Sequence, residues 1–330
     1  MSNFMNLFIA LIVAAITYGT PLLFGTLGEI LTEKSGNLNL GVEGIMFMGG
    51  AIGLGGVFYY EKAVASPSGF VAVLVGLLCA FLAGALASLI FCFITTTLRA
   101  NQNVTGLALS IFGTGVGQFV GEYMRVQEGG FISIGNTLKG YFQDSPFPAA
   151  LRNIPVVGNI LFGNSIFFYL AVLLAVALFF YLNRTRSGLY LRSVGESPAT
   201  ADAAGINVTR YKYAATVLGG GISAIGGMVY ITTIAGCVWN HEGLSGVGWL
   251  AVALVIFCMW RPLSAIWGSV LFGALMILYL RLVLPFIPTQ LYKILPYVVT
   301  VIVLIVSSMR NSKENQPPAN LGLPYFREDR

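Results

Sequence analysis

The chain has 330 residues, of which 56% are hydrophobic and only 9% are charged, and its formal net charge is +5. Because soluble domains carry roughly 25% charged residues, this composition excludes an ordinary soluble domain and indicates a protein that crosses a membrane several times. The basic surplus does not require nucleic acid as a partner, since membrane topology explains where the basic residues cluster.

Segments without Asp, Glu, Lys or Arg predict the membrane spans. About 20 helical residues cross the ~30 Å of hydrocarbon in a bilayer, and these segments lack the polar and apolar alternation of barrel strands. We therefore expect an all-α polytopic membrane protein with about nine transmembrane helices, in a single domain of residues 1–330. The expected spans are residues 1–28, 44–60, 70–98, 100–121, 164–183, 213–236, 246–260, 263–284 and 290–308.

The orientation follows from the densest basic stretch, residues 184–212, which holds five basic and two acidic side chains. Positive charge favours the cytoplasmic side, so this stretch is expected to be a cytoplasmic loop. Alternation of the spans then makes residues 122–163 an external loop and residues 309–330 a cytoplasmic tail, with the N-terminus outside.

The first motif along the chain, "SGNLNLGVEG" (residues 35–44), interrupts the apolar sequence between the first two spans. A plain turn, a cytoplasmic loop and a broken helix that lines a cavity all fit it. We favour a broken helix near residues 36–44, because irregular backbone at membrane depth is tolerated only when it is buried in protein or faces water. A helix that begins near Gly41 would point its positive end at that space. Glu43 in its first turn is then either a cap or a substrate contact.

Amide side chains near this interruption are the main candidate substrate contacts. A neutral amide donates and accepts hydrogen bonds without the cost of removing a charge from water. The candidate pathway residues are Asn37, Asn39 and Glu43, followed by Asn101 and Gln118.

The second motif, "GESPATADAAGINV" (residues 195–208), has the signals of a short helix. Ser197 is a suitable N-cap, Pro198 suits the first helical position, and Gly205 supplies a C-terminal stop. A helix of about seven residues is too short to be stable alone in water. We therefore expect it to dock, either on the cytoplasmic face of the bundle or on a partner protein.

The sequence offers little for catalysis. It contains one histidine and no His-Glu-x-x-His motif, no pair of carboxylates falls inside a predicted span, and its four cysteines lack metal-ligand spacing. We therefore expect no catalytic residue, no metal site and no cofactor in this chain. The phosphate-binding G-x-x-x-x-G-K-[ST] motif is also absent, so the energy for any driven transport has to come from another subunit.

Three segments together resemble a known family: "EKSGNLNLGVEGIM" (residues 33–46), "VGESPATADAAGINV" (194–208) and "LGLPYFRE" (321–328). They are similar to the membrane-spanning permease subunits of bacterial ABC importers for nucleosides and simple sugars, in the superfamily of ribose and branched-chain amino-acid permeases. The "NLNLGVEG" variant and the tail look like the nucleoside branch. The segments "GVGW" (246–249) and "CMWRP" (258–262) depart from the G-R-G-F and G-x-W-N-P patterns usual in that family.

The resemblance implies a permease subunit that imports nucleosides, in particular purine nucleosides, across the bacterial cytoplasmic membrane. It implies three protein partners besides membrane lipid: an ABC ATP-binding subunit that uses the ATP, a second permease subunit that makes a heterodimer, and an extracytoplasmic substrate-binding protein that is periplasmic or lipid-anchored. It also makes residues 195–207 the coupling helix that sits in the ATP-binding subunit. The residues that would make this contact are Gly195, Glu196, Pro198, Ala203, Ala204, Gly205 and Asn207. The alternatives are a permease for ribose or another simple sugar, a secondary transporter or channel, and a membrane scaffold without transport.

Overall fold

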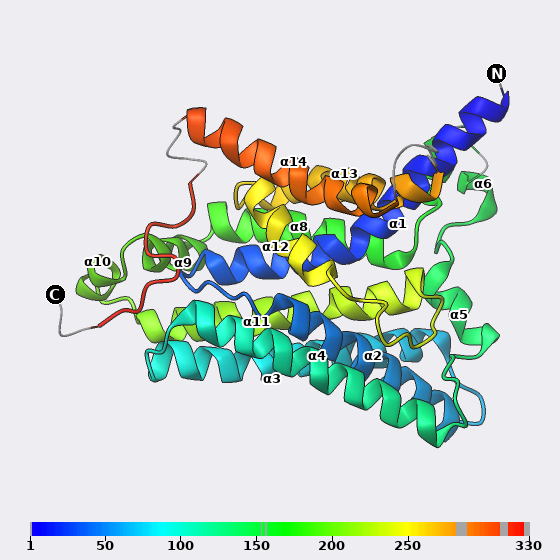
Figure 1. The fold of residues 1–330 in the computed structure, drawn as a ribbon, viewed down its shortest axis with the longest axis horizontal. Coiled ribbons are helices and arrows are strands. Elements are labelled where there is room, and N and C mark those ends of the chain that lie inside the picture. The colour runs from blue at the N-terminus through cyan, green and yellow to red at the C-terminus, as the bar shows by residue number, and fades with distance from the viewer. Residues whose placement is uncertain (1, 153, 156, 282–288, 311–315, 327–330) are drawn as a thin grey trace.

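The computed structural model describes residues 2–152, 154–155, 157–281, 289–310 and 316–326, and these residues form helices and loops without a β-strand (Figure 1). One isolated antiparallel bridge joins Ser133 to Val238. The all-helical fold that the composition predicts is therefore confirmed. The helices are α1 (Ser2–Glu33), α2 (Val42–Ala63), α3 (Gly69–Cys92), π-helical η1 (Phe93–Thr97), α4 (Gln102–Gln127), α5 (Asn136–Gln143), α6 (Ala149–Arg152), α7 (Val157–Phe162), α8 (Ile166–Arg184), α9 (Arg186–Glu196), α10 (Pro198–Ala203), α11 (Val208–Val229), π-helical η2 (Tyr230–Ile234), α12 (Val247–Phe257), α13 (Pro262–Arg281) and α14 (Thr289–Arg310).

Six helical segments of the described chain are long and apolar enough to cross a membrane. They are Phe8–Glu33, Val42–Ala63, Gly69–Thr97, Gln102–Gln127, Ile166–Arg184 and Val208–Ile234. Three further apolar helices are shorter: Val247–Phe257, Pro262–Leu278 and Ile294–Val303. The structure thus supports six of the roughly nine expected spans by length, and the other three expected spans coincide with these shorter helices.

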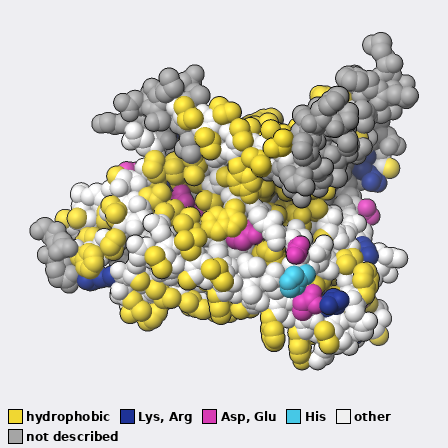
Figure 2. All heavy atoms as spheres, in the orientation of Figure 1, with side chains coloured by type: hydrophobic (Ala, Val, Ile, Leu, Met, Phe, Trp, Pro, Cys, Tyr) yellow, Lys and Arg dark blue, Asp and Glu magenta, His cyan; other side chains and the backbone are white. Residues whose placement is uncertain are grey.

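The helices lie side by side along the longest axis of the molecule, with α1, α2 and α11 at the centre (Figure 1). Helix α11 packs against α1, α2 and α3, while α4 covers α2 and α13 covers α1. The outer helices α3 and α4 expose long rows of leucine, isoleucine, valine and phenylalanine side chains. Figure 2 shows hydrophobic side chains spread over one face of the molecule, with few charged ones among them. A surface of this kind is suited to hydrocarbon rather than to water.

Glycines let the central helices approach one another closely. A Cβ atom on Gly49 of α2 would collide with the carbonyl oxygen of Ala224 on α11, and one on Gly84 of α3 would collide with that of Gly220. In lipid such close backbone contact supplies dispersion energy that a hydrophobic effect between helices cannot. The glycine-rich stretch of α11 is therefore part of the packing of the bundle.

Two of the non-helical stretches between helices of the bundle precede α2 and α12. Residues 34–41 separate α1 from α2 without helical structure. Residues 235–246 connect the end of η2 to the start of α12 without helical structure. The Ile134 N–H donates to the Cys237 carbonyl oxygen in this connection. Helix α12 has 11 residues and is therefore about 16 Å long, roughly half of the hydrocarbon thickness.

The segments predicted to be cytoplasmic lie at one end of the bundle. Figure 1 shows α9, α10 and the C-terminal segment together at this end, opposite the N-terminus, α5 and α6. The guanidinium carbon of Arg99 lies 4.9 Å from the ring centre of Phe326 in the tail. We call this the α9–α10 end. That it faces the cytoplasm, with residues 122–163 outside, stays a prediction.

Candidate functional site

The non-helical segment 34–41 is buried, and side chains satisfy its backbone. The Leu38 N–H donates to the Gln102 Oε1 atom at 2.7 Å, and the Asn39 N–H donates to Glu29 Oε1 at 3.2 Å. The Leu40 carbonyl oxygen accepts from the Ser110 hydroxyl at 2.7 Å. An exposed polar backbone at this depth would be costly, so these bonds explain how a helix break persists inside the bundle.

Glu43 lies in the first turn of α2, and its carboxylate caps a different helix. Its Oε1 atom accepts from the Gly246 N–H at 2.6 Å, and its Oε2 atom accepts from the N–H groups of Gly248 at 2.7 Å and Trp249 at 3.3 Å. These are the amide groups at the start of α12, which an α-helix leaves without internal partners. A carboxylate there also opposes the positive end of the helix dipole.

The two glycine-framed sequences "GVEG" and "GLSG" (residues 41–44 and 243–246) therefore meet in space. A Cβ atom on Gly248 would collide with the Cα atom of Glu43, so this approach requires glycine. Gly246, the N-cap of α12, has a φ angle of +87°, which also favours glycine. The start of α2 and the start of α12 thus form one joined element at the helix break.

Asn37 and Asn39 are buried in this element, and each has one amide atom without a partner. The Asn37 Nδ2 atom donates to the Thr216 hydroxyl at 2.9 Å, and Asn39 Oδ1 accepts from the Gly41 N–H at 2.9 Å. The Asn37 Oδ1 and Asn39 Nδ2 atoms are buried and bond to nothing in the described part of the chain. Buried amide atoms normally have partners, so these two can bond a further polar group.

The two predicted pathway residues on α4 lie apart from this pair. Asn101 is exposed, and its side chain caps α4 by accepting from the Val104 N–H at 3.1 Å. Gln118 lies 17 positions later on the same helix, which places it about 25 Å away along the helix axis. Its Nε2 atom lies 3.4 Å from the His241 carbonyl oxygen, in the segment that precedes α12. The structure therefore groups Asn37 and Asn39 with Glu43 but leaves Asn101 at the α9–α10 end.

Two buried carboxylates near the break are not among the residues predicted from the sequence. Helix α1 continues to Glu33, whereas the predicted span ends at residue 28, before the first charged residue. Glu29 and Glu33 are 1% and 2% exposed. Glu29 accepts from the backbone of the break, and Glu33 accepts from the indole N–H of Trp260 beyond α12. The signal in the sequence was their spacing of four, which places both on one helix face.

The predicted short helix is present as α10. The Ser197 hydroxyl accepts from the Thr200 N–H at 3.4 Å, Pro198 occupies the first turn, and Gly205 follows the helix with a φ angle of +80°. Asn207 caps the next helix, α11, by accepting from the Arg210 N–H at 2.9 Å. Serine, proline and glycine thus act at the positions that their backbone preferences predict.

One face of α10 packs on the protein, and the other is open. Pro198 and Ala201 are buried, and Ala201 forms an apolar cluster with Val194 and Val208. The exposed residues are Glu196, Ala199, Thr200, Ala203, Ala204 and Gly205. The short helix therefore docks on its own bundle and still presents a surface of small side chains.

Backbone contacts join all three segments that carried the family resemblance. The Asn320 N–H donates to the Gly195 carbonyl oxygen at 3.0 Å, and the Gly322 N–H donates to the Gly36 carbonyl oxygen at 3.2 Å. A Cβ atom on Gly195 would collide with the carbonyl oxygen of Lys34. Burial lowers the pKa of Lys34, and the nearby Glu196 carboxylate acts in the opposite direction. The helix break, the end of α9 and the tail thus form one packed corner.

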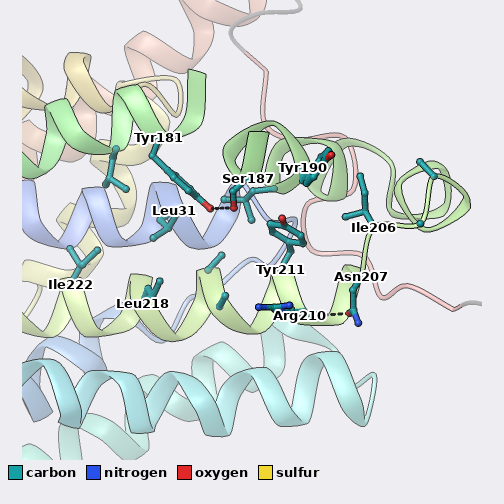
Figure 3. Close-up of a pocket in the computed structure, with 16 residues that line it drawn as sticks. Leu31, Tyr181, Ser187, Tyr190, Ile206, Asn207, Arg210, Tyr211, Leu218 and Ile222 are labelled. Atoms are coloured by element: carbon teal, nitrogen blue, oxygen red, sulfur yellow. Dashed lines mark hydrogen bonds between the residues drawn. The ribbon is translucent and has the colours of Figure 1, made fainter. Parts of the chain in front are cut away.

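A cavity of about 750 Å³ lies beside this corner, between α1, α8, α9 and α11. Figure 3 shows apolar side chains such as Leu218 and Ile222 along its deep wall, with Tyr181, Tyr190 and Tyr211 nearer the α9–α10 end. The Tyr181 hydroxyl lies 3.1 Å from the Ser187 hydroxyl. This gradient from apolar to aromatic and polar is typical of a membrane interface. The cavity's lining includes the predicted coupling residues Ala204, Gly205 and Asn207 and none of the predicted pathway residues.

Comparison with known proteins identifies the family of the chain. Residues 11–304 match the family described as branched-chain amino acid transport system / permease component. The chain belongs to this permease family. Its members are subunits of membrane transporters rather than a class of enzyme. The resemblance found in the three sequence segments is thereby confirmed.

Individual relatives align with most of the permease. It is 33% identical over 309 residues to the nucleoside ABC transporter permease protein NupC of Lactococcus lactis, an alignment that covers 92% of this chain and 93% of the relative. It is 33% identical over 326 residues to the guanosine ABC transporter permease protein NupQ of Bacillus subtilis, which covers 96% of each chain. The putative glucose ABC transporter permease protein TsgC13 of Haloferax volcanii is 34% identical over 271 residues, 81% of this chain and 76% of the relative.

Proposed function

We propose that this permease is one membrane subunit of an ATP-driven importer that carries nucleosides, in particular purine nucleosides, across the bacterial cytoplasmic membrane. The observation that carries this proposal is the 33% identity to a nucleoside and a guanosine permease over more than nine tenths of each chain. The names of these ABC transporter permeases support an ATP-binding subunit and an extracytoplasmic substrate-binding protein or lipoprotein as partners. A second permease subunit, in a heterodimer with this chain, is the third proposed partner.

The proposed topology has nine crossings, with the N-terminus outside and the tail inside. It counts the three shorter apolar helices as membrane crossings. Because α12 is too short to cross alone, its crossing also includes the non-helical residues 235–246. Irregular backbone at membrane depth needs cover by protein or a cavity. In this stretch Cys237, Trp239 and Leu244 are buried, whereas residues 240–242 are exposed. Attachment of a membrane-impermeant label to single cysteines at residues 150 and 203 in intact cells tests this orientation. Only the cysteine at residue 150 should react.

The proposed coupling helix is α10 with its flanking residues, 195–207. A surface of exposed small side chains lets a partner approach the backbone closely, and the opposite face of α10 is held by the bundle. ATP binding in the partner would therefore move α10 together with the corner that contains Gly36 and the tail. ATP is used by that partner, and this chain contributes no cofactor site.

The proposed substrate pathway runs past the joined starts of α2 and α12. The partnerless Asn37 Oδ1 and Asn39 Nδ2 atoms supply one acceptor and one donor, which is the pair that ring nitrogens and ribose hydroxyls of a nucleoside require. Glu43 organises this region by holding α12. Gln118 and Asn101 would line the pathway farther along α4.

An uptake assay tests the coupling role. The variant Ala203→Trp places a large ring on the open face of α10. Ala150→Trp is a matched control, because Ala150 is also exposed and belongs to α6 at the opposite end of the bundle. In cells that express the whole importer, Ala203→Trp should abolish nucleoside uptake and release the ATP-binding subunit during purification, while Ala150→Trp does neither. Normal uptake by Ala203→Trp would refute the coupling assignment.

Competition separates the substrate classes. Labelled guanosine uptake should be inhibited by unlabelled purine nucleosides and not by ribose, glucose or leucine. The 34% identity to a putative glucose permease favours a simple sugar as the second candidate, and inhibition by glucose or ribose alone would support it. Uptake that persists after removal of the ATP-binding subunit would instead identify a channel or a secondary transporter.

A further inference from the structure

A second, polar cavity of about 440 Å³ opens at the α9–α10 end of the bundle. It lies between η1, the residues that follow α10, the start of α11 and the tail. The side chains that line it and matter here are Thr95, Arg99, Asp202, Thr209, Lys212 and Tyr325. Neither the predicted pathway nor the open face of α10 accounts for Lys212 in this cavity.

Lys212 is the unusual residue of this cavity. The residue is 2% exposed and lines the cavity. Among the residues that the structure describes, none accepts a hydrogen bond from its ammonium group and no carboxylate pairs with it, and the ammonium nitrogen is not one of the fully enclosed polar atoms, so it borders the cavity. Burying an ammonium without a partner is costly, and buried charges in proteins are normally paired. The group also lies in the second turn of α11, near the positive end of that helix, where a cation is disfavoured.

Further donors converge on the same cavity. The N–H groups of Val208 and Thr209 are the first two of α11, and within the described structure neither has an acceptor. The Asn207 side chain accepts from the next N–H group, that of Arg210. Arg99 and Asp202 also line the cavity, and the Asp202 carboxylate accepts a hydrogen bond from the Tyr325 hydroxyl at 2.8 Å. Because these two residues have partners of their own, the proposal rests on Lys212 and the start of α11.

The volume and the donors suit a phosphate group that carries an organic substituent. Free amides at a helix start, a lysine and hydroxyl groups together are the usual protein ligands of phosphate. A volume of 440 Å³ equals that of roughly 15 water molecules in the liquid, which is more than one phosphate group fills.

We propose that this cavity binds the phosphate group of an anionic phosphate ester, with Lys212 and the start of α11 as its main ligands. The ester is either a soluble molecule or the headgroup of an anionic phospholipid. Its binding compensates the buried ammonium and ties α11, η1 and the tail together beside α10. The proposal does not depend on which substrate the permease carries.

Thermal melting of the purified full chain in phosphatidylcholine nanodiscs, in phosphate-free buffer, tests the proposal. One arm adds guanosine monophosphate or inorganic phosphate, and the other replaces part of the lipid by phosphatidylglycerol. The test variant is Lys212→Met, whose unbranched side chain reaches the position of the lysine Cε atom but lacks the charged nitrogen. The control is Arg210→Gln, because Arg210 is an exposed cation on the same helix that lines the other cavity.

We expect one of the two arms to raise the melting temperature of the wild type and of Arg210→Gln but not that of Lys212→Met. Without any anion, Lys212→Met should melt at or above the wild type, since an uncompensated buried charge has been removed. Stabilisation by guanosine monophosphate identifies a soluble ester, and stabilisation by phosphatidylglycerol alone identifies a lipid headgroup. The Thr209→Val variant should bind the phosphate ester that stabilises the wild type about threefold more weakly than the wild type does. The proposal is overturned if neither arm stabilises the wild type, or if Lys212→Met responds as strongly as the wild type.

Discussion

Replacing Glu43 by glutamine tests whether its carboxylate holds the start of α12. The two oxygens of Glu43 accept three backbone N–H groups, at 2.6, 2.7 and 3.3 Å. In Glu43→Gln one side-chain oxygen remains and can still accept from the N–H groups of Gly248 and Trp249. The amide NH₂ that replaces the other oxygen then faces the N–H of Gly246. The variant loses one charge-assisted hydrogen bond and leaves a buried donor without an acceptor.

A hydrogen bond to a charged group contributes about 1.5–3 kcal/mol, and the charge at the helix start adds roughly 0.3–1 kcal/mol. Burying a neutral amide instead of a carboxylate offsets part of this loss. We therefore expect Glu43→Gln to lower the free energy of unfolding by about 2 kcal/mol. Since 1 kcal/mol shifts the Tm of a chain of 150–250 residues by about 2–4 °C, the Tm of this longer chain should fall by roughly 4 °C.

Thermal melting of the purified protein measures the effect, and Glu61→Gln is the matched control. Glu61 lies in the last turn of α2 and accepts from one N–H, that of Gly135, at 3.0 Å from each oxygen. Its glutamine variant can keep this bond, so its stability should change by at most about 0.5 kcal/mol. Equal Tm values for the two variants would refute the capping role. An unchanged Tm with a higher transport KM in Glu43→Gln would make Glu43 a substrate contact instead.

Three further predictions concern the break, the helix packing and a buried thiol. Asn37→Ala and Asn39→Ala should raise the transport KM more than they reduce assembly with the ATP-binding subunit, and equal loss of both would leave these residues a structural role only. Gly49→Ala should cost about 1–3 kcal/mol in melting experiments, because its Cβ atom collides with a carbonyl oxygen of α11. Gly115→Ala, with no atom within 4 Å, should be neutral or stabilising by up to ~1 kcal/mol. Cys237 should resist a water-soluble maleimide at neutral pH, because its side chain is fully buried and the reagent cannot reach the sulfur. Rapid labelling of the folded protein, seen by mass spectrometry, would contradict this.

Local signals in the sequence were sufficient to predict the helical fold and the short helix α10. Ser197, Pro198 and Gly205 act through their own backbone preferences, which do not depend on distant residues. The interruption between α1 and α2 was predictable for the same reason, since glycine and asparagine break a helix locally. In these places one stretch of sequence contains all the interactions that decide the structure.

Buried charges were not predictable in this way. Glu33 remains in α1 because the indole of Trp260, more than 200 positions later in the chain, donates to it. Glu43 caps α12 rather than its own helix because folding brings residue 246 to it. Rules that end a span at a charge also hid Lys212, which lies inside a long apolar helix. Long-range partners decide these positions, and one sequence does not reveal which residues they are.

The contact between Gly36 and Gly195 limits how the permease can respond to a partner at α10. The Cα atom of Gly195 lies 3.4 Å from where a Cβ atom of Gly36 would be, and the tail bonds to both residues. Since side chains are absent at both positions, no flexible group between them can absorb a displacement. A shift of the end of α9 by a fraction of an ångström must therefore move the backbone of the helix break as well. Energy applied at this surface would reach the interior within one layer of atoms, without a long relay of side chains.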